Sequence, residues 1–205
     1  MNAQDVKKAF SRIAETMQKN RAYLIGLDQQ NGDGDLGISM AEGFLAVKTC
    51  LDNTEEKDLG MIFVKASSAL NENAPSSLGT ILSIGLMGAA KPLKGSQCIT
   101  VSELADALQA GNEKIMERAK SRPGEKTILD ALCPAVGALK EYAGKESPEA
   151  FCMAAKAAAN GAEETKNMLS KHGRAAYYGE KSLGVLDGGA VVGKLIFEAI
   201  AESDS

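Results

Sequence analysis

Apolar residues in this chain recur at helical spacing, and no segment alternates between apolar and polar residues in the manner of a strand. Val6, Phe10 and Ile13 begin such a helical pattern, three or four residues apart. The pattern predicts an amphipathic helix that runs toward Leu27. Alanine is abundant and β-branched residues never gather into alternating runs, so helix propensity dominates. We therefore expect an all-α fold.

Glycine, proline and serine divide the rest of the chain into further helical segments. The first of these helices is predicted to begin at about 36–38, and the next two to cover 59–70 and 78–90. A fourth is predicted to follow a capping box at Thr100-Val-Ser-Glu103, and the last three to span about 127–142, 147–171 and 190–201. The third of them is expected to stop at Lys91-Pro92, because proline cannot continue a helix. Seven or eight helices with short loops favour antiparallel neighbours in a bundle or closed ring. Residues 1–205, with no clear linker or repeat, are expected to form one domain.

Composition excludes several classes of function. A net charge of −4 without a Lys/Arg cluster lacks the electrostatic footprint of a nucleic-acid-binding protein, and an aromatic content of 4% leaves little for base stacking. The polar N-terminus lacks a signal-peptide apolar region, and no apolar run approaches the roughly 18–20 residues that span a bilayer. We expect a cytoplasmic protein with neither nucleic acid nor membrane as a partner. Its four cysteines lack paired spacing and are interpreted as buried free thiols.

A loop after the first predicted helix, Asp28-Gln-Gln-Asn-Gly-Asp33-Gly-Asp35-Leu-Gly37, concentrates three carboxylates within eight residues. Such carboxylates repel one another unless cations neutralise them, and no Lys or Arg occurs in this loop. Oxygen ligands without a nearby His or Cys select Mg²⁺, Mn²⁺ or Ca²⁺. Glycine N–H groups can also bond phosphates, so the loop is interpreted as a bridge between metal and nucleotide.

Two other interpretations of this loop compete. Asp and Gly are also the common residues of an ordinary helix–helix turn. An EF-hand would take Asn31, Asp33, Asp35 and Glu42 as positions one, three, five and twelve of its calcium loop. Leu36 stands where that loop requires glycine, so the turn geometry disfavours the EF-hand.

A segment near the C-terminus, Gly188-Gly-Ala-Val-Val-Gly193-Lys194, partly matches the P-loop motif of nucleotide-binding proteins. Leu195 follows it in place of the hydroxyl residue that would bind magnesium, and no strand is predicted before it. Lys194 is therefore assigned to a solvated helix face.

Three segments resemble motifs of one family. Leu24-Ile-Gly-Leu-Asp28 and Gly32-Asp-Gly-Asp35-Leu-Gly37 resemble a segment of the L subunit, or C-terminal nucleotide domain, of dihydroxyacetone kinases. Gly124-Glu-Lys-Thr127-Ile-Leu-Asp130 looks like that family's G-D-K-T-M-L-D. Gly173-Arg174-Ala-Ala-Tyr177 through Asp187-Gly-Gly189-Ala looks like its closing motif, G-R-A-x-Y…D-P-G-A. The segments occur in family order across nearly the whole chain.

The resemblance implies an up-and-down barrel of eight antiparallel helices, with ADP or ATP and two Mg²⁺ ions at one end. Matched by position, the metal ligands would be Asp28, Asp33 and Asp35. The matched nucleotide contacts would be Leu36, Gly37, Ile38, Ser39, Ser77, Leu78, Gly79, Thr80, Gly124, Cys133, Arg174, Asp187, Gly188 and Gly189. Independently of the resemblance, a helix N-terminus near Ser77 suits an anion.

Alternatives remain for some of these residues. Arg174 could form a surface ion pair, and Gly188-Gly189 could simply begin the last helix. His172 matches no motif and is expected at the surface. Leu36 stands where the family commonly has His, and Gly188 where it commonly has Pro. The lost histidine leaves the three matched metal ligands in place, so the resemblance still implies nucleotide binding, and the departure bears on the substrate, the choice of partner or the rate.

The expected function is that of the ADP/ATP-Mg-binding subunit of a dihydroxyacetone-type kinase. Phosphoryl transfer needs positioning and charge neutralisation, and no catalytic side chain is identified beyond the metal ligands. In the family, a separate subunit or domain holds the short-chain keto-sugar, so the resemblance implies a substrate-binding kinase subunit as partner. In one branch, a phosphotransferase-system protein rephosphorylates the bound ADP. The alternative is a non-catalytic nucleotide sensor, and a homodimer is left open.

Overall fold

The computed structural model describes residues 1–30 and 32–202, and their regular structure is helical. The helices are α1 (Ala3–Lys19), α2 (Arg21–Asp28), α3 (Leu36–Asp52), α4 (Leu59–Asn73), α5 (Ser77–Leu93), α6 (Val101–Ala119), α7 (Leu129–Glu141), α8 (Ser147–Glu164) and α9 (Gly188–Ala201), with 3₁₀ helices η1 (Thr165–Asn167) and η2 (Arg174–Ser182). The described residues form no strand, only one isolated bridge between Asn2 and Cys98. The expected all-α class is confirmed. No described helix is both long and apolar enough to cross a bilayer.

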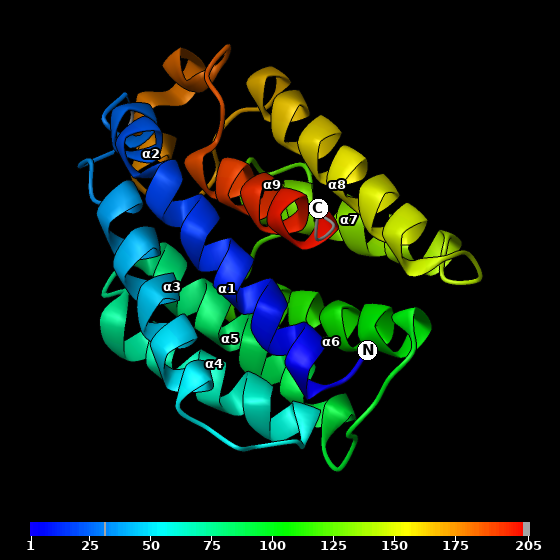
Figure 1. Cartoon of the computed structure of the whole chain (residues 1–205). Helices are drawn as coiled ribbons and strands as arrows, with labels where there is room; N and C mark the ends of the chain where they lie inside the picture. The colour runs from blue at the N-terminus through cyan, green and yellow to red at the C-terminus, as the bar shows by residue number, and fades with distance from the viewer. Residues whose placement is uncertain (31, 203–205) are drawn as a thin grey trace.

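Eight of the described helices form a closed ring in which each packs on the next along the chain (Figure 1). The contacts run from α1 to α3, and then through α4, α5, α6, α7 and α8 to α9. The ring closes where α9 returns to α1, and the short α2 packs on α3. The expected barrel of about eight up-and-down helices is confirmed.

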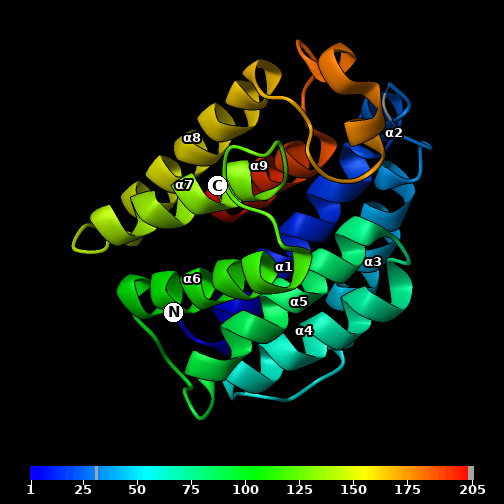
Figure 2. The ribbon, with the colours of Figure 1, turned by 180° about the vertical axis from the view of Figure 1, so that it is seen from behind.

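Because neighbouring helices run in opposite directions, every second helix begins at the same end of the barrel. In both views the starts of α3, α5, α7 and α9 lie at the end that also carries α2 and the orange segment between α8 and α9 (Figures 1 and 2). A helix N-terminus carries a partial positive charge. The topology therefore gathers several positive helix ends at one end of the barrel.

Three helix ends differ from those expected from the sequence. The first predicted helix is divided at Asn20, whose side-chain amide donates to the carbonyl of Thr16 at 2.9 Å and ends α1 there. Pro92 does not stop α5, which ends one residue later at Leu93, because a proline in the last turn removes a single helical hydrogen bond. The helix predicted for 147–171 ends at Glu164 in a 3₁₀ turn. In contrast, the capping box at Thr100 is confirmed.

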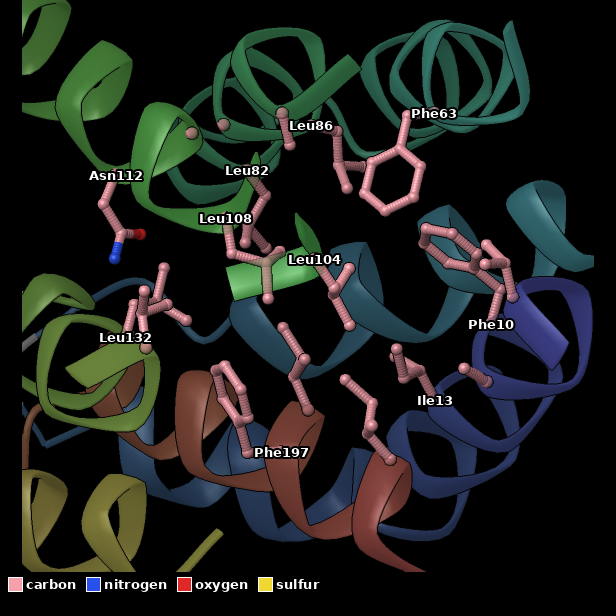
Figure 3. A pocket seen from close by; sticks show the side chains of 18 of the residues that line it. Phe10, Ile13, Phe63, Leu82, Leu86, Leu104, Leu108, Asn112, Leu132 and Phe197 are labelled. Carbon is pink, nitrogen blue, oxygen red and sulfur yellow. The ribbon is translucent and has the colours of Figure 1, made fainter. Parts of the chain in front are cut away.

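The barrel is filled by apolar side chains from all eight helices of the ring. Phe10 and Phe63 meet edge to face there, with ring centroids 5.8 Å apart. A cavity of about 130 Å³ remains between these side chains, and Figure 3 shows them pointing into it. Asn112 also lines this cavity, 4% exposed, and its Nδ2 atom has no hydrogen-bond partner in the described part of the protein. The interior is thus apolar, and a polar functional site has to lie at an end.

Candidate functional site

A second pocket, of about 280 Å³, opens at the end of the barrel where α3, α5, α7 and α9 begin. Its walls come from five places: the aspartate loop, the starts of α5 and α9, the loop before α7, and the segment between α8 and α9. Unlike the interior cavity, it combines apolar surface with many charged and polar groups. Such a concave site with convergent polar groups is the usual form of a small-molecule site.

The three aspartates converge as the sequence predicted. Asp28 ends α2, whereas Asp33 and Asp35 lie in the loop before α3, yet one carboxylate oxygen of each lies within 4.8 Å of the other two. Gly34 makes this possible, because its φ of +81° is a backbone conformation that favours glycine, and its N–H donates to Oδ2 of Asp28 at 2.7 Å. Asp28 is thereby held toward the other two.

Electrostatics at this cluster call for a cation. Burial, followed by the neighbouring charges of Asp33 and Asp28, raises the pKa of Asp35 above its usual value, whereas Arg174 acts in the opposite direction. Arg174 forms an ion pair with Asp33 at 2.7 Å, but its side chain is 67% exposed. One exposed guanidinium cannot balance three carboxylates, and an all-oxygen set suits a hard divalent cation such as Mg²⁺.

Helix N-termini form the part of the pocket suited to an anion. Leu36 is the first residue of α3, Ser77 and Leu78 open α5, and Gly188 with Gly189 opens α9, and all five line the pocket. Unpaired N–H groups and the helix dipole make such ends favourable for phosphate. The pocket therefore presents a carboxylate cluster beside anion-attracting helix ends, an arrangement that fits a metal-bound polyphosphate.

Asp187 lies at the start of α9, where its carboxylate accepts a hydrogen bond from the N–H of Ala190 at 2.7 Å. Burial is the largest effect on this group and raises its pKa to about 6 from 3.8, and nearby Asp130 contributes in the same direction. The bond from Ala190 and the ammonium of Lys126 oppose the rise only in part. A carboxylate in a cleft with a strongly shifted pKa is typical of functional sites.

Several predicted nucleotide contacts lie in this pocket and others do not. Those that line it are Leu36, Ser77, Leu78, Arg174, Asp187, Gly188 and Gly189, together with Asp28, Asp33 and Asp35. Those outside its lining are Gly37, Ile38, Ser39, Gly79, Thr80, Gly124 and Cys133. Gly37 and Gly79 instead sit where backbone carbonyls approach closely, so they have packing reasons to be glycine. Burial raises the pKa of Cys133 to about 11, so its thiol stays protonated at neutral pH.

The EF-hand and P-loop interpretations find no support in the structure. Glu42 lies in an outer groove between α3 and α4 and not at the aspartate cluster. Asn31, which the EF-hand interpretation takes as position one of the calcium loop, lies outside the described residues. Lys194 lies within α9, 3.7 Å from Glu198 on the same helix, as a solvated helix face predicts.

Sequence reasoning left several residues of the pocket wall unassigned, and three of them, Lys126, Thr127 and His172, bear on its chemistry. Lys126 and Thr127 belong to the G-E-K-T segment, of which only Gly124 was predicted as a nucleotide contact. The match of this segment to the family motif was the signal that could have pointed to them. His172 was expected at the surface, but it lines the pocket and its Nε2 lies 2.7 Å from Oε2 of Glu125. This pairing is the largest of the effects that lower the pKa of Glu125 to about 2. No spacing in the sequence links these two residues.

Comparison with known proteins agrees with this geometry. Residues 30–202 match the family described as the DAK2 domain. The chain is 30% identical over 194 residues to the ADP-binding subunit DhaL of the PEP-dependent dihydroxyacetone kinase of Escherichia coli (strain K12), covering 94% of this chain and 92% of that protein. It is 33% identical over 193 residues to the corresponding subunit of kinase 1 of Listeria innocua, with the same coverage.

A solved structure gives the same relationship in three dimensions. The dihydroxyacetone kinase from C. freundii in complex with AMP-PNP and Mg²⁺ matches with a TM-score of 0.78 and 26% identity, over all of this chain and 34% of that one. The fold, the order of the motifs along the chain and the family match agree with one another. The chain therefore belongs to the DAK2 domain family, as a relative of the L subunits of dihydroxyacetone kinases.

Proposed function

We propose that this chain, as one nucleotide-binding domain, is the ADP- or ATP-binding subunit of a dihydroxyacetone-type kinase. One observation carries the proposal: the carboxylates of Asp28, Asp33 and Asp35 share a pocket with the N-termini of α3, α5 and α9. The carboxylates would hold magnesium, two ions by resemblance to the family, and the helix ends would face the phosphates. The names of the relatives, which are ADP-binding kinase subunits, support the same conclusion.

Each part of the pocket has a role in phosphoryl transfer. Bound magnesium would neutralise phosphate charge, and the three aspartates would fix where it binds. Arg174 would supply a further positive charge once its partner Asp33 turns to the metal. Backbone N–H groups at the start of α5, such as that of Ser77, would orient the phosphate oxygens. The transferred group would pass to a hydroxyl of a short-chain keto-sugar that reaches the open mouth of the pocket.

Calorimetry with ADP, with and without Mg²⁺, tests this site. Asp33→Ala is expected to weaken Mg²⁺-dependent ADP binding more than about tenfold, since it removes a metal ligand. Asp106→Ala is the matched control, because Asp106 is an exposed carboxylate paired with Lys140 away from the pocket. Equal ADP affinity in the wild type and the Asp33 variant would refute the proposed site.

The acceptor is proposed to arrive on a partner subunit. The segment next to Arg174 presents Tyr177, 92% exposed, and half-exposed Tyr178 toward solvent. Exposed tyrosines beside a donor site suit a protein interface. Tyr177→Ala should weaken binding of a substrate-holding kinase subunit while leaving ADP affinity unchanged, and Leu45→Ala, on the exposed side of α3, should change neither. Full kinase activity of the chain alone would overturn the requirement for a partner.

A regulatory nucleotide sensor is the second candidate, favoured by Leu36. This side chain, 6% exposed, places an apolar group beside the aspartate cluster, at a position where the resemblance leads one to expect a titratable histidine. Phosphate transfer to a ketose in the reconstituted complex supports the kinase. Nucleotide-dependent partner binding without turnover supports the sensor. Supplying either ATP or a phosphotransferase-system phosphocarrier in the same assay identifies the phosphoryl donor.

A further inference from the structure

Lys126 is a buried cation whose side chain is fully engaged by one segment of the chain. It lies in the loop between α6 and α7 and is only 3% exposed. Its Nζ atom donates to the carbonyl oxygens of Val185 at 2.8 Å, of Met168 at 3.2 Å, and of Ser182. All three acceptors belong to residues 165–187, which we call the closing segment.

The bonding of this ammonium group defines what Lys126 can do. A lysine ammonium has three N–H donors and no acceptor, and here the three donors meet three carbonyls. None is left for a phosphate, although the residue lines the pocket. Burial lowers the pKa of Lys126, while the carboxylate of Asp187 acts in the opposite direction. The side chain therefore acts on protein backbone and not on the ligand.

The loop that carries Lys126 is itself anchored. Both carboxylate oxygens of Asp130, at the start of α7, accept backbone N–H groups of this loop, from Gly124 and from Thr127 at 2.7 Å. Lys126 has a φ of +61°, a left-handed conformation that is unfavourable for a residue with a Cβ atom. A strained backbone held from both sides aims the side chain at the closing segment.

The closing segment, in turn, has little hydrophobic anchoring of its own. Between Leu169 and Leu183 it exposes large apolar side chains, and its main element is the 3₁₀ helix η2. Its internal support is polar: Ser182, fully buried, donates to the carbonyl of Gly179 and accepts from the N–H of Ser170. Arg174 extends from this segment into the pocket. The position of its guanidinium thus depends on how the backbone beneath it is held.

We propose that Lys126 is a positioning residue of the nucleotide site: it fastens the closing segment and thereby places Arg174 over the aspartate cluster and Asp187 at the start of α9. This inference rests on the proposed function for its effect on nucleotide. Its effect on the closing segment is independent of any ligand. The two can therefore be measured separately.

Limited digestion with trypsin measures the fastening in ligand-free protein. The closing segment contains four cleavage sites, at Lys166, Lys171, Arg174 and Lys181. Lys126→Met, which keeps the stem but removes the donors, should speed cleavage at these sites about tenfold, because cleavage follows local opening. Lys140→Met is the matched control, since Lys140 is an exposed lysine on α7. Cleavage at the wild-type rate, or an increase spread over the whole chain, would overturn the proposal.

Conservative variants keep the test decisive. Lys126→Arg retains charge and donors and should restore most of the wild-type protection from trypsin. Lys126→Gln removes the charge but retains an amide donor, and it replaces the methionine variant if that variant does not fold. Loss of protection in Lys126→Gln with recovery in Lys126→Arg supports the fastening role. Equal protection in all of these variants contradicts it.

ADP affinity measured in a double-mutant cycle separates positioning from general destabilisation. Arg174→Ala should weaken ADP binding about tenfold in the wild type but less than about twofold in Lys126→Met, because in that variant the guanidinium of Arg174 is no longer held over the aspartate cluster. If Arg174→Ala weakens ADP binding by the same factor in the wild type and in Lys126→Met, Lys126 only stabilises the fold. If wild-type protein does not bind ADP, the proposed function fails, while the digestion result still decides the role of Lys126.

Discussion

Asp187 offers the sharpest quantitative test of the pocket's electrostatics. Its carboxylate is the N-terminal cap of α9, accepting from the N–H of Ala190, and its pKa is raised to about 6, mainly by burial. Asp187→Asn keeps an oxygen that can accept the same hydrogen bond, because asparagine and aspartate cap helices about equally well. The substitution removes the buried charge alone. We therefore expect it to stabilise the protein at neutral pH.

The size and pH range of this gain follow from the pKa. The folded-state pKa of about 6 exceeds the usual 3.8, so the folded protein holds this proton more tightly than the unfolded chain does. Stability is therefore lost as pH rises from about 4 to about 6, and the full penalty persists above that range. At about 1.4 kcal/mol per unit, the shift corresponds to an upper bound of about 3 kcal/mol. Asp187 is only half-buried, so we expect about 1–2 kcal/mol.

Urea unfolding of ligand-free protein at several pH values between 4 and 8 measures this effect. The free energy of unfolding of Asp187→Asn should equal that of the wild type near pH 4 and exceed it by about 1–2 kcal/mol from pH 7 upward. Taking the difference between the proteins cancels other titrating groups. Asp106→Asn, at an exposed carboxylate, should show no such rise. A pH-independent difference, or a less stable Asp187 variant at pH 8, would refute the buried-charge reasoning.

Three further predictions concern packing and reactivity. Gly37→Ala should destabilise the protein by about 3 kcal/mol in urea unfolding, because the new Cβ would lie 2.2 Å from a carbonyl oxygen of α2. Gly26→Ala, with nothing within 4 Å, should instead stabilise it by about 0.5–1 kcal/mol, and the reverse order would contradict this packing. The expectation that all four cysteines are buried is wrong for Cys98 and Cys152, which are exposed. Cys133, with a pKa of about 11, should react with iodoacetamide at pH 8 far more slowly than these two thiols, as followed by peptide mass spectrometry. Gly188→Ala should lower the free energy of unfolding by about 1 kcal/mol in the wild type and by clearly less in a Leu36→Ala background, because the added Cβ would lie 2.6 Å from the Leu36 side chain. Equal losses of stability in both backgrounds would argue against that contact.

Helix content was predictable because it depends on local periodicity, whereas helix ends depend on single contacts. The apolar pattern runs unbroken from Val6 toward Leu27, so nothing in it marks the division at Asn20, where a side-chain amide ends α1. Likewise, no glycine or proline occurs between Glu164 and Gly173, so the sequence does not mark the end of α8 at Glu164, where the chain turns to build the closing segment. The first end depends on a local side-chain contact and the second on the turn of the chain after α8, and the apolar periodicity signals neither of them.

The sequence predicted that three aspartates of one loop converge, but its spacing carried no signal of the contacts that the topology of the barrel creates. The aspartates converge because eight consecutive residues and one left-handed glycine suffice to bring them together. The approach of Lys126 to Val185 joins segments that are 59 residues apart, and that of His172 to Glu125 spans 47. Neither pair follows from spacing. Only the order of helices around the barrel, which brings the loop before α7 beneath the closing segment, makes these contacts.

The two departures from the family pattern turn out to be one structural feature. Leu36 and Gly188 are far apart in sequence and looked independent, one lacking a histidine and the other a proline. In the structure, a Cβ atom at position 188 would lie 2.6 Å from Cδ2 of Leu36, so the apolar side chain occupies the space that a larger residue at the start of α9 would need. A leucine at position 36 therefore favours glycine at position 188. Because both residues also line the pocket beside the aspartates, this pair affects the shape and polarity of the wall while the three aspartates stay together. Any difference in substrate or partner from the relatives is thus expected to depend on the pair together and not on Leu36 alone.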